Sequence, residues 1–379
     1  MGNGAMPMRK AARDNEQAQT IRAAVLRHRG GPLSIETTEM EGPQDDEVLV
    51  RIAASGICHT DISYGNEWYD ASEGPLILGH EGAGIAERAG KNVKGFRRGD
   101  HVVLSYQSCG ACGACRSGRP ADCRDLYELN FGFRRPGGGN AYLRSGVKGH
   151  FFGQSSFATH TLATVRNLVK VKKDLPLELL APLGCGLQTG AGTVMNSLAV
   201  KAGKSIAVFG TGSVGLAAIM AARIVGAAPI VGIDILPKRL KLARELGATH
   251  TIDSRREDVA TRIRDITGSG VDYSVEGTGN DEMFRLSMEL LNPGGTAALL
   301  TGASGPGRLP GGRKALSIIQ GDAVPQLFIP QLISFYRKGL FPLDRLVKFY
   351  DFKQINKAIA DSMRGSTIKP VLRISSSLP

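Results

Sequence analysis

Hydrophobic and polar positions between residue 205 and about residue 305 alternate in a pattern that predicts strands and helices in turn. Residues 205–209 and 229–233 are short apolar runs that predict buried strands, and residues 216–225 between them have helical apolar spacing. Further helices and strands are predicted at 238–246, 249–252, 257–266, 272–276, 281–291 and 296–302. This order predicts a doubly wound parallel β-sheet, and therefore an α/β fold.

The pattern differs before and after this region. From residue 21 to about residue 174, short apolar runs are separated by glycines, which predicts a β-rich domain. Its predicted strands include 23–28, 34–40, 47–55, 82–90, 100–106, 157–163 and 167–171. Residues 1–20 are polar and lack periodicity, so we expect a mobile tail. Residues 305–312 are rich in Gly and Pro and predict a loop, and a final strand is expected at 368–374.

A glycine motif lies between the first strand and the first helix of the alternating region. Gly210, Gly212 and Gly215 form G-x-G-x-x-G, and Asp234 ends the next strand 19 residues after the last glycine. In this position the glycines let the backbone approach a pyrophosphate, and the acidic residue accepts the ribose hydroxyls of NAD. The alternative is a plain turn in a glycine-rich chain, but the surrounding strand–helix–strand order favours dinucleotide binding.

Composition indicates an ordinary globular protein. At 379 residues the chain is long enough for two domains, and its 42% hydrophobic and 22% charged content is typical of soluble proteins. Six cysteines are too few for a disulfide scaffold of this length, and no secretory leader opens the chain. The longest apolar segment, 216–228, is interrupted by Arg223 and is too short to cross a bilayer. We therefore expect a cytoplasmic protein without a membrane partner.

The formal net charge of +12 raises the question of nucleic-acid binding. The basic residues occur in scattered pairs, such as Arg97–Arg98 and Lys172–Lys173, and aromatic residues do not interleave with them. This distribution favours a basic solvated surface, and we expect no nucleic-acid partner.

Four of the six cysteines are close together in the sequence. They follow the spacing C-x2-C-x2-C-x7-C at Cys109, Cys112, Cys115 and Cys123. Four thiolates on a glycine-rich loop can surround one zinc ion tetrahedrally and leave no position for a substrate, so this site is predicted to be structural. The alternatives are four unrelated thiols or an iron–sulfur cluster.

The other two cysteines have a histidine as a candidate partner. Cys58, His80 and Cys185 would supply two thiolates and one imidazole, with a fourth zinc position open to water or substrate. Spacing alone leaves two alternatives, in which His80 is a hydrogen-bonded interior residue and Cys185 an inert core residue.

Several motifs in a fixed order resemble the zinc-containing medium-chain alcohol dehydrogenases. The Gly-His-Glu sequence at 79–81, followed by Gly84, Gly90 and Val93, is similar to that family's signature. The four-cysteine loop has the family's structural-zinc spacing, and the likeness runs from about residue 23 to the end. Residues 58–61, 152–157 and 182–190 look most like those of the benzyl, aryl and geraniol-type enzymes.

The resemblance implies a two-domain organisation with two zinc ions per chain and NAD as the cofactor. A GroES-like catalytic domain would comprise residues 21–186 and 320–379, and a Rossmann domain would comprise residues 187–319. The family's assembly implies a homodimer or a homotetramer.

The resemblance also implies roles for residues of the catalytic site. Cys58, His80 and Cys185 resemble the zinc ligands, and Glu81 resembles an acid beneath the metal. Asp61 resembles the carboxylate that orients the ligand histidine, and Thr60 the hydroxyl that bonds to the substrate oxygen. Many relatives have a histidine at the position of Ser63, which would end the proton relay. Serine is not a base near neutral pH, so water or another residue must complete the transfer.

A second set of residues resembles the family's cofactor contacts: His59, Thr189, Gly210, Gly212, Ser213, Val214, Gly215, Asp234, Arg239 and Lys369. For two of them a structural alternative is open, since Arg239 could be an exposed helix residue and Lys369 a charge at a strand end. Ser105, Phe157 and Trp68 match or neighbour substrate-pocket positions, with ordinary packing as the alternative. Together with the subgroup likeness they favour aryl or allylic primary alcohols.

The predicted function is zinc-dependent hydride transfer between such an alcohol and NAD, giving the aldehyde. The alternative within the same fold is an S-(hydroxymethyl)glutathione dehydrogenase, which the plentiful arginines do not exclude. A zinc-ribbon nucleic-acid-binding protein belongs to another class and would leave the dinucleotide motif and the second metal site unexplained.

Overall fold

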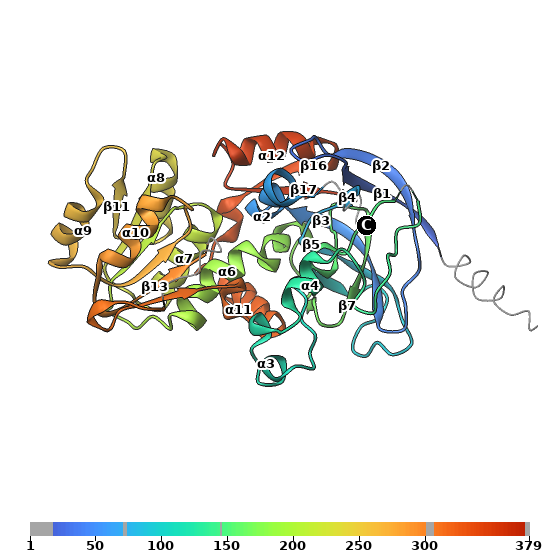
Figure 1. Cartoon of the computed structure of the whole chain (residues 1–379), viewed down its shortest axis with the longest axis horizontal. Helices are drawn as coiled ribbons and strands as arrows, with labels where there is room; N and C mark the ends of the chain where they lie inside the picture. The colour runs from blue at the N-terminus through green and yellow to red at the C-terminus, as the bar shows by residue number, and fades with distance from the viewer. Residues whose placement is uncertain (1–17, 71–73, 145, 301–306, 376–379) are drawn as a thin grey trace, which may run out of the picture. The chain divides into compact units, whose positions relative to one another are not determined.

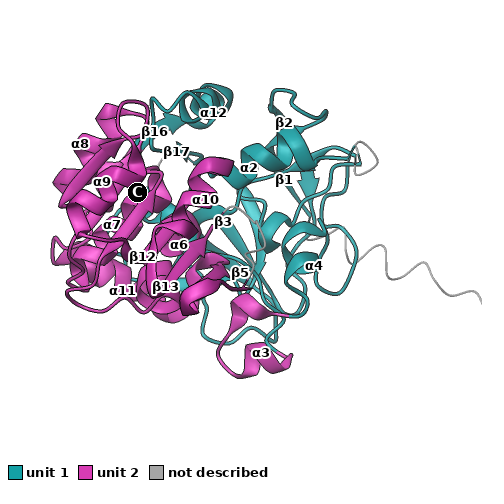
Figure 2. Ribbon diagram, turned by 60° about the vertical axis from the view of Figure 1, so that its left-hand side comes forward, with its two compact units in different colours: residues 1–110, 124–184, 348–379 teal, residues 111–123, 185–347 magenta. Residues whose placement is uncertain are grey.

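The computed structural model describes residues 18–70, 74–144, 146–300 and 307–375, and the chain divides into two compact units (Figures 1 and 2). Unit 1 comprises residues 1–110, 124–184 and 348–379, and unit 2 comprises residues 111–123 and 185–347. The domain ranges expected from the sequence stay a prediction. The expected tail lies mostly outside the described residues, and the first strand begins at Gln19.

Unit 1 is rich in short strands, as its pattern of short apolar runs predicts. The strands are β1 (Gln19–Leu26), β2 (Ser34–Met40), β3 (Glu47–Gly56), β4 (Leu76–Ile77), β5 (Glu81–Ala89), β6 (His101–Leu104), β7 (His160–Thr164), β8 (Leu168–Val171), β16 (Val347–Asp351) and β17 (Lys369–Arg373). The helices and helical turns are α2 (His59–Ser63), η1 (Tyr64–Trp68), α4 (Leu126–Phe131), η4 (Phe151–Gly153), α5 (Leu177–Leu180), η5 (Ala181–Gly184), η10 (Phe352–Gln354) and α12 (Ile355–Met363).

The larger sheet of unit 1 has the order β16-β17-β3-β5-β6-β8, with β7 also paired to β3. A smaller sheet has the order β2-β1-β4. Strand β3 is buried along almost its whole length because it lies in the middle of the larger sheet. It pairs antiparallel with both β5 and β17, so its carboxyl end lies beside the first residues of those two strands.

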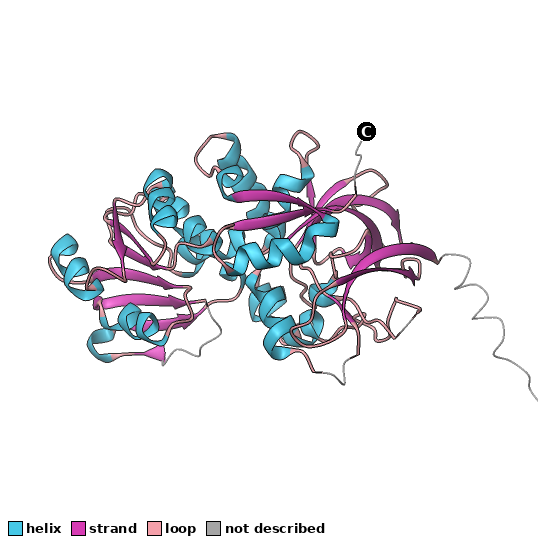
Figure 3. Ribbon diagram, turned by 90° about the horizontal axis from the view of Figure 1, so that it is seen from above, coloured by secondary structure: helices cyan, strands magenta, loops and turns pink. Residues whose placement is uncertain are grey.

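Unit 2 contains the alternating region, in which helices flank the strands (Figure 3). Its strands are β9 (Ile206–Phe209), β10 (Ile230–Asp234), β11 (His250–Asp253), β12 (Val271–Glu276), β13 (Leu291–Leu299), β14 (Gly307–Arg308) and β15 (Lys314–Ser317). The sheet order is β11-β10-β9-β12-β13-β15-β14, and every pair except β14–β15 is parallel. This topology confirms the doubly wound sheet predicted from the sequence.

The helices and turns of unit 2 are α3 (Gly113–Arg116), η3 (Pro120–Asp122), α6 (Gly186–Gly192), η6 (Thr193–Ser197), α7 (Ser213–Ile224), α8 (Pro237–Leu246), α9 (Val259–Thr267), α10 (Asp281–Glu289), η7 (Pro310–Gly312), η8 (Gln320–Asp322), α11 (Pro325–Arg337) and η9 (Leu343–Leu346). Part of the loop expected at 305–312 forms β14 and η7, and residues 305 and 306 lie outside the described residues.

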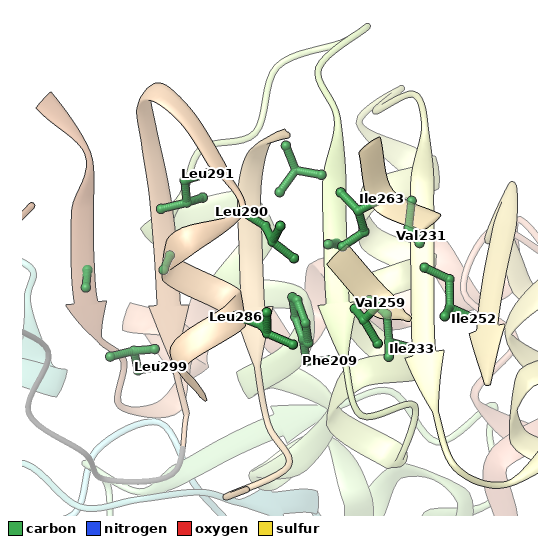
Figure 4. Packing of buried hydrophobic residues seen from close by; sticks show 14 residues of the cluster. Phe209, Val231, Ile233, Ile252, Val259, Ile263, Leu286, Leu290, Leu291 and Leu299 are labelled. Atoms are coloured by element: carbon green, nitrogen blue, oxygen red, sulfur yellow. The ribbon is translucent and has the colours of Figure 1, made fainter. Parts of the chain in front are cut away.

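One hydrophobic core of unit 2 lies between the sheet and two helices (Figure 4). Val259 and Ile263 of α9 and Leu286 of α10 pack against sheet residues that include Phe209 and Ile233. These side chains are almost fully buried, and full burial of one such side chain contributes roughly 1.5–3 kcal/mol. The core therefore fixes the carboxyl ends of β9 and β10, where the dinucleotide motif lies.

None of the helices among the described residues is both long enough and apolar enough to cross a membrane.

Candidate functional site

Strand pairing in unit 1 brings together chemical groups that are far apart in the sequence. The last residue of β3, Gly56, is paired with Glu81 at the start of β5 and with Val371 near the start of β17. Cys58 follows β3 by two residues, and His80 immediately precedes β5. The antiparallel register therefore places the thiol and the imidazole at the same edge of the sheet.

Four metal-ligating residues meet at this edge. The ligand atoms of Cys58, His80, Glu81 and Cys185 all lie within 4.8 Å of one another. Nε2 of His80 is buried and has no hydrogen-bond partner among the described residues, which is expected of a nitrogen that binds a metal ion. Two thiols and one imidazole are a zinc donor set, so the residues present fit the predicted catalytic zinc.

Asp61 connects two of these ligands. One of its carboxylate oxygens accepts a hydrogen bond from the backbone N–H of Cys58 at 2.9 Å. The other accepts from Nδ1 of His80 at 2.8 Å and from the backbone N–H of Gly79 at 3.1 Å. These bonds fix the tautomer of His80 and direct its Nε2 toward the thiols, which is the orienting role expected of Asp61.

Electrostatics at His80 are dominated by Asp61. Burial lowers the pKa of His80, but the charge of Asp61 and the hydrogen bond to it more than offset this and raise the pKa to about 10. The same carboxylate would raise the basicity of the imidazole toward a metal ion bound at Nε2.

Thr60 lies close to the same cluster. Its Oγ1 is 3.8 Å from Sγ of Cys58, so its hydroxyl is near the metal ligands, as the predicted role requires. Ser63 is buried at the end of α2. His59, at the start of α2, is exposed.

Glu81 is paired with a buried lysine. Nζ of Lys369 lies 2.9 and 3.1 Å from the two carboxylate oxygens of Glu81 and 3.2 Å from the carbonyl oxygen of Ile57. Burial raises the pKa of Glu81, and the ammonium of Lys369 opposes that shift. The sequence resemblance assigns Lys369 to the cofactor pyrophosphate, whereas the structure places its ammonium on Glu81.

Aromatic rings surround His80. The Phe152 ring stacks on the imidazole with 4.3 Å between ring centroids, and the Phe131 ring packs edge-on against Phe152. Trp68 then packs against Phe131. The predicted pocket residue Trp68 is thus connected to His80 through two phenylalanines, and its own side chain is 53% exposed.

The segment that carries Phe152 has an unusual backbone. His150, Phe152 and Ser155 have φ angles of 70°, 54° and 60°, which are uncommon for residues other than glycine. Gln154 holds this segment in place because its amide donates to the carbonyl oxygens of His80 and Ser105 and accepts from the N–H of Gly82. Strained residues persist only where surrounding contacts enforce them, and they concentrate at functional sites.

The other two predicted pocket residues are fully buried. The hydroxyl of Ser105 donates to the carbonyl oxygen of Gly184 at 2.7 Å. The Phe157 ring lies against Gly79, where a Cβ atom would be only 2.6 Å from the ring. Both positions show ordinary packing contacts, and their contact with a substrate stays a prediction.

Cys185 is linked to the dinucleotide turn through helices of unit 2. It immediately precedes α6, and the hydroxyl of Thr189 on that helix donates to the carbonyl oxygen of Cys185 at 2.9 Å. Helix α6 packs against α7, which begins directly after the glycine motif. The helix pair therefore fixes the position of Cys185 relative to the turn.

The turn has the geometry that a dinucleotide site needs. Gly210 has a φ of 88°, and Gly215 approaches the Gly210 carbonyl so closely that a Cβ atom would overlap with it. Gly212 caps the amino terminus of α7, and Ser213 and Val214 form its first turn. Backbone N–H groups at the start of this twelve-residue helix are available for a phosphate.

Asp234 lies at the carboxyl end of β10 and is buried. One carboxylate oxygen accepts from the N–H and the hydroxyl of Thr211 at 2.7 and 2.9 Å, and the other accepts from the N–H of Leu236. Nη1 of Arg239 is 3.9 Å from the same carboxylate. Asp234 therefore stabilises the glycine turn through its hydrogen bonds with Thr211. It also lies at the position that the sequence motif assigns to ribose recognition.

The four-cysteine cluster is also assembled. The sulfur atoms of Cys109, Cys112, Cys115 and Cys123 lie within 4.8 Å of one another. Helix α3 and the turn η3 bend the loop between them. This donor set fits a structural zinc ion.

Sequence reasoning gave no role to Phe131, Phe152 and Gln154 around His80, or to Gln320 beside Cys185. Residues 152–157 resemble those of the benzyl, aryl and geraniol-type enzymes, but their sequence does not predict the left-handed backbone that places Phe152 against His80. Gln320 carries no local signal at all.

Comparison with known protein families supports this geometry. The alcohol dehydrogenase GroES-like domain matches residues 44–173, and the zinc-binding dehydrogenase family matches residues 213–320. A geraniol dehydrogenase from Castellaniella defragrans is 44% identical over 371 residues, which cover 95% of this chain and 99% of that protein.

Two solved structures are similar over almost the whole chain. An alcohol dehydrogenase zinc-binding domain protein from Burkholderia ambifaria superposes with a TM-score of 0.91 at 48% identity, covering 95% of this chain and all of the other. A benzyl alcohol dehydrogenase from Acinetobacter calcoaceticus gives a TM-score of 0.90 at 42% identity, covering 94% of this chain and all of the other.

Proposed function

The chain belongs to the zinc-containing medium-chain alcohol dehydrogenase family, and from this premise we propose that it transfers a hydride between a primary aryl or allylic alcohol and NAD. The observation that carries the proposal is the cluster of Cys58, His80 and Cys185, in which Asp61 orients the imidazole. These three residues would hold one zinc ion, and the four-cysteine cluster would hold a second.

The chemistry divides between the bound groups and the chain. When bound in the three-ligand site, a zinc ion would polarise an alcohol oxygen as a Lewis acid and lower the pKa of the hydroxyl, and NAD would supply the hydride acceptor. Thr60 would form a hydrogen bond with the substrate oxygen and pass its proton on to water, since Ser63 is not a base near neutral pH. Asp61 keeps the imidazole of His80 in one tautomer throughout.

Cofactor choice is assigned to Asp234. Its carboxylate would accept the ribose hydroxyls of NAD and repel a 2′-phosphate. Its bonds to Thr211 and Leu236 keep the charge at the end of β10. His59, Thr189, Arg239 and Lys369 are proposed as further cofactor contacts.

The substrate class is supported by the aromatic rings that surround His80 and by the relatives. Flat aromatic or allylic groups pack favourably against rings such as Phe152 and Trp68. The similar proteins from Castellaniella defragrans and Acinetobacter calcoaceticus are named for geraniol and benzyl alcohol. We also propose that the enzyme acts in the cytoplasm as a homodimer or homotetramer.

A substrate and cofactor panel tests the proposal. The purified protein is assayed with benzyl alcohol, geraniol, ethanol and S-(hydroxymethyl)glutathione, each with NAD and NADP. We expect kcat/KM with NAD to be highest for benzyl alcohol or geraniol. A clear preference for the glutathione adduct would instead assign the alternative activity within this fold.

The variant Asp234→Ala tests the cofactor assignment. Removing the charge should lower the preference for NAD over NADP by about tenfold or more, a change of at least about 1.4 kcal/mol. Thr211→Val is the matched control, because it removes a hydrogen bond to Asp234 but keeps the carboxylate. Unchanged selectivity in Asp234→Ala would contradict the assignment.

A further inference from the structure

A strained turn of unit 2 lies beside the ligand Cys185. Gln320, Gly321 and Asp322 form η8 and have consecutive φ angles of 55°, 64° and 48°. Glycine adopts such angles freely and aspartate more readily than most residues, but glutamine does so rarely. Gln320 is thus held in an unfavourable conformation, which calls for a structural or functional reason.

The turn directs the side chain of Gln320 at the sulfur of Cys185. Nε2 of Gln320 donates to Sγ of Cys185 at 3.3 Å, although the two residues are 135 positions apart. Oε1 of Gln320 accepts from Nε2 of Gln188 at 2.9 Å. Together the two bonds place the amide oxygen of Gln320 toward Gln188 and its NH2 group toward the sulfur.

Packing against α6 holds the turn in this place. A Cβ atom on Gly321 would lie 2.7 Å from Cα of Gly192 and 2.8 Å from the carbonyl oxygens of Gln188 and Thr189. Nδ2 of Asn196 donates to the Gly321 carbonyl at 3.1 Å. The turn is therefore fixed to the same helix that begins at Cys185, and Gln320 is 8% exposed.

We propose that Gln320 is a positioning residue of the metal site. Its amide N–H holds the sulfur of Cys185 in place and weakens electron donation from the thiolate to the metal. The proposal rests on the proposed function only in that Cys185 is taken as a metal ligand. A hydrogen bond to a ligand sulfur orients it and withdraws electron density from it, and loss of such outer contacts typically lowers metal affinity about 10–100-fold. Positioning the sulfur in this way gives the strained turn a function.

Three substitutions of Gln320 separate the hydrogen bond from the backbone strain. Gln320→Leu keeps much of the side-chain volume but has no donor. Gln320→Asn tolerates a left-handed backbone but is one methylene too short to reach the sulfur. Gln320→Gly relieves the strain and also lacks the donor. Asp322→Asn is the matched control in the same turn, since the side chain of Asp322 interacts with Ser197.

Metal release from the holoenzyme is the main measurement. Zinc transfer to a chromogenic chelator should resolve a labile site from the slower four-cysteine site. We expect about 10–100-fold faster release from the labile site in all three Gln320 variants, and release within twofold of wild type in Asp322→Asn. The thermal midpoint of Gln320→Gly should not fall below that of wild type.

Cobalt substitution provides a readout of the sulfur itself. Without the N–H donor, the thiolate should donate more strongly, so its charge-transfer band to cobalt should move to longer wavelength in the Gln320 variants. Wild-type release rates and an unshifted band in the Gln320 variants would overturn the proposal. It would also be overturned if Asp322→Asn and the Gln320 variants all lost metal faster and all showed the same drop in thermal midpoint. A wild-type protein that binds only the four-cysteine zinc would instead contradict the proposed function.

Discussion

At the scale of single residues, Asp61 and Thr60 have different proposed roles beside the candidate metal ligands. Asp61 accepts hydrogen bonds from Cys58, Gly79 and His80 through its two carboxylate oxygens, so we propose that it acts by orienting His80. Thr60 carries a hydroxyl near the sulfur of Cys58 and can both accept and donate. We therefore propose that the proton of the alcohol passes to Thr60.

Thr60→Ala should remove most of the turnover. General acid–base groups contribute typically about 10²–10⁴-fold, so we expect kcat to fall by at least about 100-fold at pH 7.5. Thr60→Ser keeps the hydroxyl and should retain most activity. Ser63→Ala should change kcat by less than about threefold, since serine is not a base at this pH. Equal losses in Thr60→Ala and Ser63→Ala, measured in steady state with saturating NAD, would contradict this relay.

Residue identities could be predicted from the sequence where they depend on motif spacing, and less well where they depend on contacts. The candidate ligands Cys58, His80 and Cys185 followed from spacing together with the family likeness, and the structure brings them together. The cofactor contact of Lys369 stays a prediction, but the sequence did not show that its ammonium is bound by Glu81, which follows because β5 and β17 both begin beside the end of β3. Such a pairing is a property of strand register and is not visible in the local sequence.

At the scale of elements, hydrophobic periodicity predicted most strands and helices of unit 2 to within a few residues. It could not predict the segment 150–155 or the turn η8, because both depend on left-handed residues other than glycine. Those conformations are imposed by distant partners, such as Gln154 bonding to the carbonyl of His80 and Gln320 bonding to Cys185. The elements that sequence reasoning missed are thus the ones that position ligands.

His150, at the start of this segment, should make stability depend on pH. Burial and the charge of Arg135 lower its pKa to about 3, from an ordinary value near 6.5. The unfolded chain therefore binds a proton before the folded one, and the stability that neutral His150 contributes is complete above about pH 6.5 and is lost as pH falls toward 3. In urea unfolding, the free energy of unfolding of wild type should fall with decreasing pH more steeply than that of His150→Asn, by up to about 1.4 kcal/mol per pH unit over this window.

Asparagine is chosen at position 150 because it tolerates a φ of 70°. His250→Asn is the control, since His250 is exposed on β11. The same slope in His150→Asn and wild type would show that His150 takes up its proton as readily in the folded protein as in the unfolded chain.

At the scale of the whole molecule, the two metal-ligating clusters are connected through unit 2. The turn η3 immediately precedes Cys123 of the four-cysteine cluster, and it lies against η8. The turn η8 in turn supplies Gln320 to Cys185. A structural zinc ion stabilises the fold around it, so we expect this contact to make the position of η8 depend on the four-cysteine loop.

Loss of the structural zinc should therefore weaken the other metal site. In Cys115→Ser we expect about one zinc ion per chain instead of two, and release of the remaining ion should be about tenfold faster or more than from wild type. Pro120→Gly keeps all four cysteines but loosens η3, and it should accelerate release in the same direction by a smaller factor. Arg116→Ala, on the same loop but exposed, is the control. Zinc content by mass spectrometry and release to a chelator are the measurements. If Cys115→Ser holds its single zinc as firmly as wild type, the four-cysteine loop stabilises only its own surroundings, and η8 keeps Gln320 in place without it.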